Sequence, residues 1–461
     1  MEDRLISETS PADWSYVAEG GATIVLAYNG PPHPDFNGTV LRARKAPVQP
    51  GDRDCKPDNG QDPNLDSEEV DDPIVVFQKE VIQRLVPSDA LPLLRKIRVE
   101  HDWLTELAAL VEKDRPKVRR QKDKIDVTRR RAVLATDLVG GNGWAIEIKP
   151  KWGFLPSPHH LSPQTRSVKT RTCRFCMHAH FKMIHDGHEP AGDFCPLDLY
   201  SGDKLRVTRA VLALWDGWVN SKGSANNLRV FVSGETIHPD NDDSINRLAA
   251  LILPKGHALD TIILRQRFAA SVVSALMQSS VLPTLSRLQR KLDVLDIEGL
   301  EKLWEAVHGD GISETALSFS AASGEPSLQE WRSFLEEYLA GHETMDHAHP
   351  DPAKLRYYTL AYLLSMSFKD CSIIVRPADG QIKASVSVID LDAKSVKKLS
   401  QWAKLDRQIV TTYGTVGNKK LCADAHHQEI MTPSRSGVFL WTVSLLTLTV
   451  SRLAGSRRKP T

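Results

Sequence analysis

Two aspartates stand twenty residues apart, at the start and the end of one predicted β-hairpin. Asp370 follows a predicted helix over 352–368 and leads into the first strand, and Asp390 follows the returning strand. Phosphoryl-transfer enzymes use such a pair: one carboxylate orients or accepts the proton of the acceptor hydroxyl, and the other holds Mg²⁺. This chemistry needs positioning and charge neutralisation more than covalent catalysis. The alternative is that both aspartates only cap turns.

Basic residues recur at spacings that would gather them around a phosphorylated ligand. Glu147, Lys149 and Lys151 alternate along a predicted strand over 144–149 and its extension, so we expect them on one face. A proline-stiffened tail, KWGFLP, completes this segment. One carboxylate and two ammonium groups on a shared face suit a highly phosphorylated ligand, whereas the plainer interpretation is a solvated strand face.

Two further groups follow helical spacing. His178 and Lys182 lie four residues apart in a predicted helix over 176–184, which places them on one helix face. Lys394, Lys398 and Trp402 are also four apart and predict a second basic stripe on one face of a helix. Both stripes would offer cations to phosphate groups.

Residues of the predicted nucleotide side come from a glycine turn and two strands. Gly20, Gly21, Ala22 and Thr23 form the turn of a predicted hairpin over 14–28, where glycine lets backbone N–H groups approach phosphate oxygens. An ordinary tight turn is the alternative. Arg42, on the next predicted strand (37–45), and the Asn226–Arg229 segment before a strand over 228–233 could also reach phosphates. No P-loop motif competes with this assignment.

Cysteines around the first basic helix could bind zinc. Cys173, Cys176 and Cys195, with His180 one helical turn after Cys176, would form a tetrahedral Cys3His set. His185 and His188 are alternative fourth ligands, and buried free thiols are the alternative to a metal site.

The order of predicted elements indicates a mixed α+β chain with a hinge at the GGNG segment, 140–143. Strands, a helix over 90–113 and a buried strand over 132–138 precede it. A mostly helical region over 243–339, broken by a loop over 309–326, follows. A polar stretch over 47–72 is predicted to be a long loop with a disordered centre. We therefore expect domains over 1–140 and 141–430, and a tail over 431–461.

Composition excludes several classes of protein. The 461 residues contain 41% hydrophobic and 25% charged residues, the balance of a globular chain. A net charge of only +1 and the absence of a recognisable RNA- or DNA-binding motif argue against nucleic acid as partner. Six cysteines suit a reducing compartment. An uncharged run of 16 residues, 436–451, is shorter than the roughly 18 of a membrane span. We interpret it as a terminal strand, a helix or an irregular tail, and a membrane anchor is the alternative.

These motifs together resemble the inositol-pentakisphosphate 2-kinases. EGGAT, EIKPKWGFLP, TCRFCMHAHFK, FCPLDLYSG, NNLRVF, KDCSIIV and IDLD appear here in the order seen in that family, and the resemblance covers roughly 14–422. The wording of the cysteine segments is similar to the fungal and animal branch. The resemblance implies a two-lobed kinase-like fold of the inositol polyphosphate kinase type, with a small β-rich N-lobe and a larger α/β C-lobe that carries a helical insertion. It also implies transfer of the ATP γ-phosphate to the 2-hydroxyl of inositol 1,3,4,5,6-pentakisphosphate.

The resemblance also implies roles for individual residues. Asp370 matches the catalytic aspartate, and Asp390 matches the magnesium ligand. Nucleotide contacts are implied for Gly20, Gly21, Ala22, Thr23, Arg42, Glu147, Arg229 and Asp390. Phosphates of the inositide would be held by Lys124, Lys149, Lys151, His178, Lys182, Asn226, Lys394 and Lys398, with Trp402 at an aromatic position. ATP and Mg²⁺ are the implied cofactors, and we expect a monomer in the nucleus or the cytoplasm.

Some residues depart from the family pattern, and alternative functions follow. Thr23 replaces a usual asparagine, and Lys398 is arginine in some members. A related kinase of different regiochemistry, or a catalytically silent inositol-polyphosphate-binding scaffold, would keep the same lysines. The scaffold would lack Asp370 or Asp390, and both are present.

Overall fold

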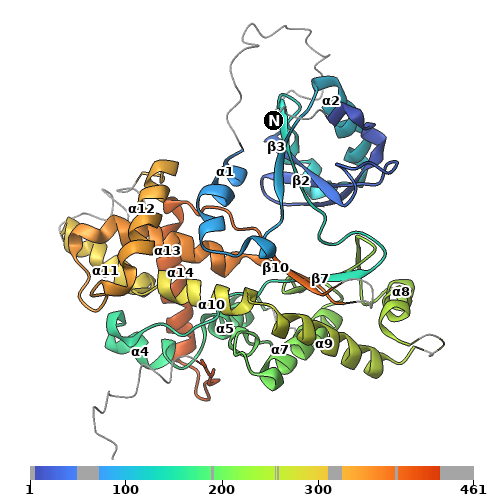
Figure 1. The fold of residues 1–461 in the computed structure, drawn as a ribbon. Coiled ribbons are helices and arrows are strands. Elements are labelled where there is room, and N and C mark those ends of the chain that lie inside the picture. Colours follow the sequence, from blue (N-terminus) through green and yellow to red (C-terminus); the bar gives the residue numbers. More distant parts are fainter. Residues whose placement is uncertain are drawn as a thin grey trace, which may run out of the picture. The chain divides into compact units, whose positions relative to one another are not determined.

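Strands from the first third of the chain build the first of two antiparallel sheets, which Figure 1 shows beside helix α2 (His101–Val111). The strand order is β1-β2-β3-β6-β4, and β5 pairs with β3 outside this path. Trp103, Leu104 and Leu107 recur at helical spacing on α2 and enter the same apolar core as the sheet. The strands are β1 (Trp14–Glu19), β2 (Thr23–Tyr28), β3 (Thr39–Pro47), β4 (Leu94–Arg98), β5 (Asp123–Ile125) and β6 (Arg131–Thr136).

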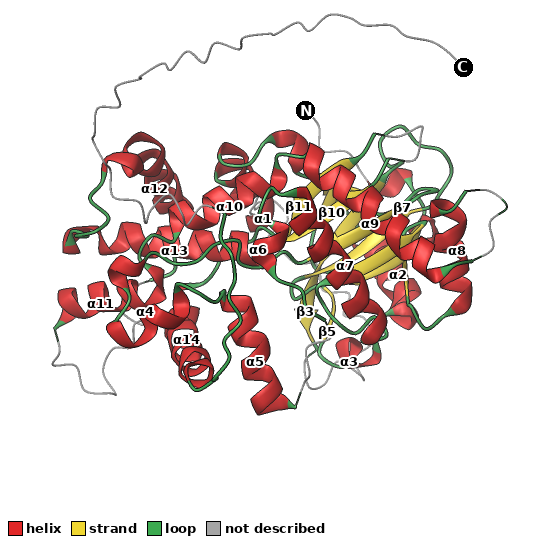
Figure 2. Ribbon diagram, turned by 90° about the horizontal axis from the view of Figure 1, so that it is seen from below, coloured by secondary structure: helices red, strands yellow, loops and turns green. Residues whose placement is uncertain are grey.

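The second sheet joins segments that are far apart in the sequence. Its order is β11-β10-β7-β8-β9, and every pairing is antiparallel. All five residues of the central strand β7 are buried, and helices α7 and α9 lie over this sheet (Figure 2). The sheet therefore places β7 directly beside the β10–β11 hairpin. The strands are β7 (Trp144–Ile148), β8 (Leu228–Val232), β9 (Glu235–Ile237), β10 (Ser372–Arg376) and β11 (Ser385–Ile389).

Helices form the larger core around this second sheet. Helix α13 (Leu355–Asp370) is buried along nearly its whole length and packs against α10 and α11. Its burial is consistent with the almost continuous apolar run in its sequence. The other helices are α1 (Pro73–Glu80), α3 (Lys117–Arg120), α4 (Pro163–Lys169), α5 (Arg174–Asp186), α6 (Pro196–Leu199), α7 (Lys204–Asn220), α8 (Asp242–Ile252), α9 (Thr261–Gln278), α10 (Val281–Leu292), α11 (Asp296–His308), α12 (Leu328–Gly341) and α14 (Leu399–Gly414).

The structure is a computed structural model that describes residues 6–48, 72–187, 192–254, 256, 259–309, 324–378 and 383–425. The predicted tail over 431–461, and the predicted loop over 47–72 apart from its ends, lie outside the described residues. Within the described ranges, no single helix is long and apolar enough to span a membrane. A bent pair, α9 with the segment Val281–His308, meets the test by length and composition only.

The secondary structure predicted from the sequence is correct for most elements. The expected mixture of helices and strands is confirmed, as are the N-terminal hairpin and the β10–β11 hairpin. The single helix predicted over 90–113 is wrong in its first half. Residues 94–98 form β4 because they pair with β6, and the helix begins only at His101.

Candidate active site

A cavity of about 1170 Å³ lies between α5, the end of α13, the start of α14 and the loop that follows β7. Asp193 and Asp370 supply its acidic side chains, and seven basic side chains line the same walls. This excess of cations suits a ligand that carries several negative charges. The basic residues are Lys151, Arg174, Lys182, Lys369, Lys394, Lys398 and Lys420.

Asp370 ends α13 and places its carboxylate between two of these lysines. Lys394 Nζ donates to Asp370 Oδ2 at 2.9 Å, and Lys151 Nζ lies 3.5 Å from Oδ1. Burial would raise the pKa of Asp370, but the hydrogen bond from Lys394 and the nearby lysine charges outweigh it, so the pKa lies below its usual value. The carboxylate is therefore ionised at neutral pH, as a group that accepts a proton or a hydroxyl hydrogen bond must be.

The cavity itself lowers the pKa of its basic groups. Burial lowers the pKa of Lys151, and the charge of Lys149 lowers it further against the opposing effect of Asp370. Burial and then the charges of Arg174, Lys182 and Lys151 lower the pKa of His178 to about 4. A bound polyanion would relieve this repulsion, so the arrangement is electrostatically suited to an anionic ligand.

Lys151 and Asp390 both have a backbone conformation that is rare for side-chain-bearing residues. Each has φ of 62°, in the left-handed region. Such strain costs of order 1–3 kcal/mol and occurs often at functional sites. Asp390 directly follows β11, and Ile389 pairs with Ser372, so the hairpin returns Asp390 to the end that carries Asp370. The second sheet therefore brings both aspartates predicted from the sequence to the same end of the β10–β11 hairpin.

Asp390 has a second carboxylate beside it. Burial raises the pKa of Asp392, the charge of Arg42 lowers it, and the charge of Asp390 raises it again. The negative charge of Asp390 beside Asp392 makes a pair of carboxylates whose repulsion a divalent cation would relieve. Oxygen donors of this kind fit Mg²⁺.

Glu147 is held at the centre of the same sheet. The hydroxyl of Ser372 donates to Glu147 Oε1 at 2.7 Å, and Arg229 Nη1 donates to Oε2 at 3.3 Å. Glu147 and Arg229 are direct partners across β7 and β8. The backbone N–H of Lys149 donates to Asn227 O at 3.1 Å, and Asn227 Nδ2 donates to Lys149 O at 3.2 Å. This pairing fixes the chain just before Lys151.

The glycine hairpin between β1 and β2 stands on a buried cluster of charges. Lys45 and Arg115 both pair with Glu19, at 3.0 Å each, and Arg115 also pairs with Asp123 at 2.6 Å. Gly20 N donates to Thr23 O at 2.9 Å and closes the turn. An added Cβ at Gly20 or Gly21 would meet no atom within 4 Å, and neither glycine has a left-handed backbone. The surrounding fold therefore does not require glycine at these two positions.

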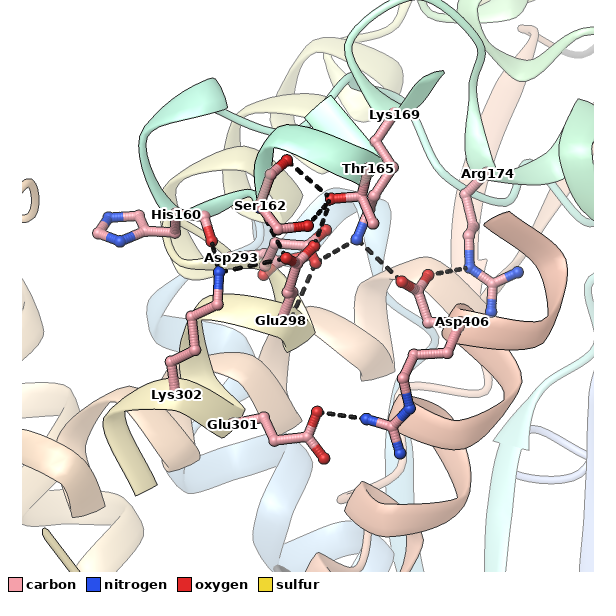
Figure 3. Close-up of polar contacts among 12 residues, drawn as sticks. His160, Ser162, Thr165, Lys169, Arg174, Asp293, Glu298, Glu301, Lys302 and Asp406 are labelled. Carbon is pink, nitrogen blue, oxygen red and sulfur yellow. Dashed lines mark hydrogen bonds and ion pairs between the residues drawn. The ribbon is translucent and has the colours of Figure 1, made fainter. Parts of the chain in front are cut away.

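Buried carboxylates behind the cavity form ion pairs with some of its basic side chains. Figure 3 shows Asp406 between Arg174, with which it pairs at 3.0 Å, and Lys169, with which it pairs at 2.9 Å. Lys169 also pairs with Asp296. Burial would lower the pKa of Lys169, but Asp296 and Asp406 raise it above its usual value. Burial raises the pKa of Asp296 to about 6 in spite of Lys169. These ion pairs anchor α4, α5 and α14 to the start of α11.

Four cysteines converge next to α5. The Sγ atoms of Cys173, Cys176, Cys195 and Cys422 all lie within 4.8 Å of one another, and those of Cys173 and Cys195 are 3.9 Å apart. Zinc–sulfur bonds of about 2.3 Å in a tetrahedron place the sulfurs about 3.8 Å apart. The set therefore fits a structural zinc ion.

His180 is not part of this set, so the prediction of His180 as fourth ligand is wrong. It lies one helical turn beyond Cys176, and its ring packs edge-on against Tyr413 with centroids 5.5 Å apart. Cys422 takes the fourth place because its backbone N–H binds Arg171 O at 2.8 Å and brings the chain back to the start of α5.

Comparison with known proteins identifies the family. A family model described as inositol-pentakisphosphate 2-kinase matches residues 16–408. The chain belongs to the inositol-pentakisphosphate 2-kinase family. An inositol-pentakisphosphate 2-kinase of Cryptococcus neoformans is 34% identical over 87% of this chain and 94% of its own length. Relatives with the same name from Arabidopsis thaliana (29% identical, 93% and 98% covered) and Danio rerio (25% identical, 87% and 93% covered) also match.

Membership in the inositol-pentakisphosphate 2-kinase family confirms the resemblance inferred from the motifs. The structure gathers most of the predicted substrate residues with Asp370 around the one cavity. Those lining it are Lys151, His178, Lys182, Asn226, Lys394, Lys398 and Trp402. Lys149 and Lys124 are not among its lining residues; Lys124 lies on β5, where it pairs with Ala46.

Two of the predicted local geometries are wrong. Lys394, Lys398 and Trp402 do not share one helix, because Ser395 caps a short 3-10 turn at Val396–Lys398 and α14 begins at Leu399. Strand β7 ends at Ile148, and the turn at Lys151 follows, so the strand face predicted to carry Glu147, Lys149 and Lys151 does not extend that far.

The side chains of the cavity that the sequence interpretation missed include Trp152, Arg174, Lys369 and Lys420. Arg174 was detectable, since it lies four residues before His178 on the helix that carries Lys182. Lys369 gave no such signal. It is fully buried, pairs with Asp293 and sits 4.1 Å above the ring of Trp152, all contacts between distant parts of the chain.

The loop after β7 should tolerate no side chain at Gly153. A Cβ there would lie 2.5 Å from Tyr200 Cδ2 and 2.7 Å from Cγ, and Tyr200 is itself buried. We expect Gly153→Ala to lower the free energy of unfolding by about 1–3 kcal/mol, as overpacking does. Denaturant unfolding measures this, with Gly21→Ala as the matched control in open space. Equal stability of both variants would contradict the packing argument.

Proposed function

We propose that the protein transfers the γ-phosphate of ATP to the 2-hydroxyl of inositol 1,3,4,5,6-pentakisphosphate and produces inositol hexakisphosphate. The observation that carries this proposal is the cavity in which an ionised Asp370 stands among seven basic side chains. A pentakisphosphate needs several cations for its phosphates and one carboxylate for its free hydroxyl. Family membership supports the same reaction.

In the proposed reaction Asp370 accepts the proton of the 2-hydroxyl as its oxygen attacks the γ-phosphorus and the bond to ADP breaks. Lys151 and Lys394 hold the carboxylate in place and keep it ionised. Lys182, Lys398 and His178 bind phosphates of the inositide, and Asn226 and Trp402 complete the walls. Lys124 and Lys149 would act from outside the cavity lining, on phosphates at its entrance.

The nucleotide side of the proposal involves residues of both sheets. Gly20, Gly21, Ala22 and Thr23 would cover the phosphates, and Arg42, Glu147 and Arg229 would contact the nucleotide. Asp390 would hold Mg²⁺, which neutralises charge on the ATP phosphates when bound. The close carboxylate of Asp392 supports this assignment.

The fold and setting of the protein complete the proposal. We propose a two-lobed kinase-like architecture, with an N-lobe over 1–140 and a C-lobe over 141–430, and the separate antiparallel sheets support it. We further propose that the protein acts as a monomer in the nucleus or the cytoplasm. A structural zinc ion would bind the four cysteines near α5, where sulfur donors at tetrahedral spacing support it.

Asp370→Asn tests the reaction directly. Purified protein is incubated with Mg²⁺, ATP and inositol 1,3,4,5,6-pentakisphosphate, and products are separated by anion exchange. Loss of the base should lower kcat by about 10²–10⁴-fold. Calorimetry should show inositide binding at least as tight as before, because the variant removes a negative charge from the cavity. A wild-type rate in the variant would exclude Asp370 as the base, and a wild type without product would exclude the reaction.

Gly21→Ala tests the nucleotide loop. Because the position is open and its backbone ordinary, the melting temperature should not change. The KM for ATP should rise, since a methyl group would keep nucleotide phosphates from the backbone N–H groups. The KM for the inositide serves as the internal control and should stay constant. An unchanged KM for ATP would show that this hairpin is only a turn.

Metal analysis tests the cysteine set. Purified protein should contain about one zinc per chain. Cys422→Ser should lose the metal and melt at a lower temperature, whereas His180→Ala, the matched control, should retain it. Zinc that persists in Cys422→Ser but is lost in His180→Ala would restore the Cys3His alternative, and a native protein without zinc would remove the site.

A further inference from the structure

Gln289 is a buried amide on the side of α10 that faces the protein core. Its exposed fraction is 0%, and the neighbouring Leu285, Leu288 and Leu292 are buried as well. An amide in such surroundings costs free energy unless its donors and acceptor are all satisfied. If this position served packing alone, a leucine would suffice. The hydrogen bonds of the amide therefore indicate the role of Gln289.

The amide of Gln289 connects two segments of the proposed active site. Its Oε1 accepts from Gly153 N at 2.7 Å, and its Nε2 donates to Lys151 O at 3.0 Å and to Phe368 O at 2.9 Å. Tyr200 Oη lies 3.2 Å from the same nitrogen. Only one orientation of the amide satisfies these partners, because an N–H must face an oxygen and two carbonyls must face the NH₂ group.

These contacts hold the backbone beside two residues of the proposed active site, Lys151 and Asp370. Lys151 is held by its carbonyl while its backbone has φ of 62°, and its Nζ reaches to 3.5 Å from Asp370 Oδ1. Phe368 stands two residues before Asp370 at the end of α13. One side chain therefore sets the distance between the turn that carries Lys151 and the helix end that carries Asp370.

The rest of this face of α10 acts on the same two segments. Ser286, three residues earlier, donates to Gly153 O at 3.2 Å. Asp293, four residues later, pairs with Lys369, the residue before Asp370. Residues three and four apart share one helix face, so α10 presents Ser286, Gln289 and Asp293 together.

We propose that Gln289 is a positioning residue of the phosphotransfer site, which fixes the turn that carries Lys151 against the helix end that carries Asp370 and so keeps the carboxylate aimed at the acceptor. The inference rests on the proposed function, in which Asp370 is the base. Gln289 itself touches neither substrate, and its effect passes through the backbone at Lys151 and Phe368.

Gln289→Met tests this, because methionine has nearly the same length and makes none of these hydrogen bonds. A Lys151 that has moved away no longer lowers the pKa of Asp370, so the acid limb of the kcat/KM profile should move to higher pH. The kcat/KM for the inositide should fall about 10- to 100-fold, as a small misplacement of a reacting group does. The KM for ATP should not change, since no nucleotide residue is touched.

Leu288→Ala is the matched control, since Leu288 is as buried on the same helix. It should lower the melting temperature without moving the acid limb. A wild-type profile in Gln289→Met, or an equal shift in Leu288→Ala, would overturn the inference. If the methionine variant does not fold, Gln289→Glu keeps the acceptor for Gly153 N and loses donation to the two carbonyls. It should shift the limb in the same direction, and an unshifted limb would overturn the inference.

Calorimetric binding of inositol pentakisphosphate separates this inference from the proposed function. If the wild type shows no turnover, the proposed reaction fails, but inositide binding can still show whether Lys151 is in place. Gln289→Met should then bind inositol pentakisphosphate more weakly than the wild type, and Leu288→Ala should not. Equal binding by wild type and Gln289→Met would overturn the positioning role whether or not the reaction occurs.

Discussion

Repulsion among cations is the constraint on which the rest of this structure depends. Seven lysine and arginine side chains share the walls of one cavity. Burial, and then the charges of neighbouring cations, lower the pKa values of Lys151 and His178. Carboxylates placed around the cavity offset this repulsion. Asp370 lies between two lysines, Asp293 pairs with Lys369 from below, and Asp406 pairs with Arg174. The binding site can therefore stay assembled before its ligand arrives.

The buried ion pairs contribute more to geometry than to stability. Desolvation offsets much of the attraction between charges in a protein interior, so a buried pair by itself is weak evidence of stabilisation. The pairs here connect α5, α13 and α14, which line the cavity, to one another or to neighbouring helices. Lys169 joins α4 to α11 and α14, and Lys369 joins the end of α13 to the end of α10. Because the pairs lie behind the cations that face the ligand, they determine where those cations point.

Sequence reasoning recovered what is local in this site. The glycine turn, the His178–Lys182 pair and the two aspartates of the β10–β11 hairpin each depend on spacing within one or two elements, and the structure has these elements where they were predicted. Two of the failures involve segments whose conformation depends on a distant partner. Residues 94–98 follow helical periodicity but become a strand because β6 offers hydrogen bonds. His180 satisfies helical spacing, yet Cys422, which follows Cys176 by more than two hundred residues, occupies its place. No local pattern could have shown Gln289 or Lys369 as parts of the site.

Contacts between distant segments also determine how much of the chain the cavity needs. The family model ends at residue 408, whereas Val416, Asn418 and Lys420 still line the cavity. Several contacts hold this last stretch in place: Thr172 donates to Lys420 O at 2.7 Å, and Asp424 accepts from Leu155 N at 2.8 Å. Arg290, one residue after Gln289 on α10, pairs with the same Asp424 at 2.9 Å. One end of α10 therefore connects the turn at Lys151, the end of α13 that carries Asp370 and the closing wall of the cavity. The cysteine set joins this wall to α5, so the chain must continue to about residue 424 for the cation-rich cavity to be complete.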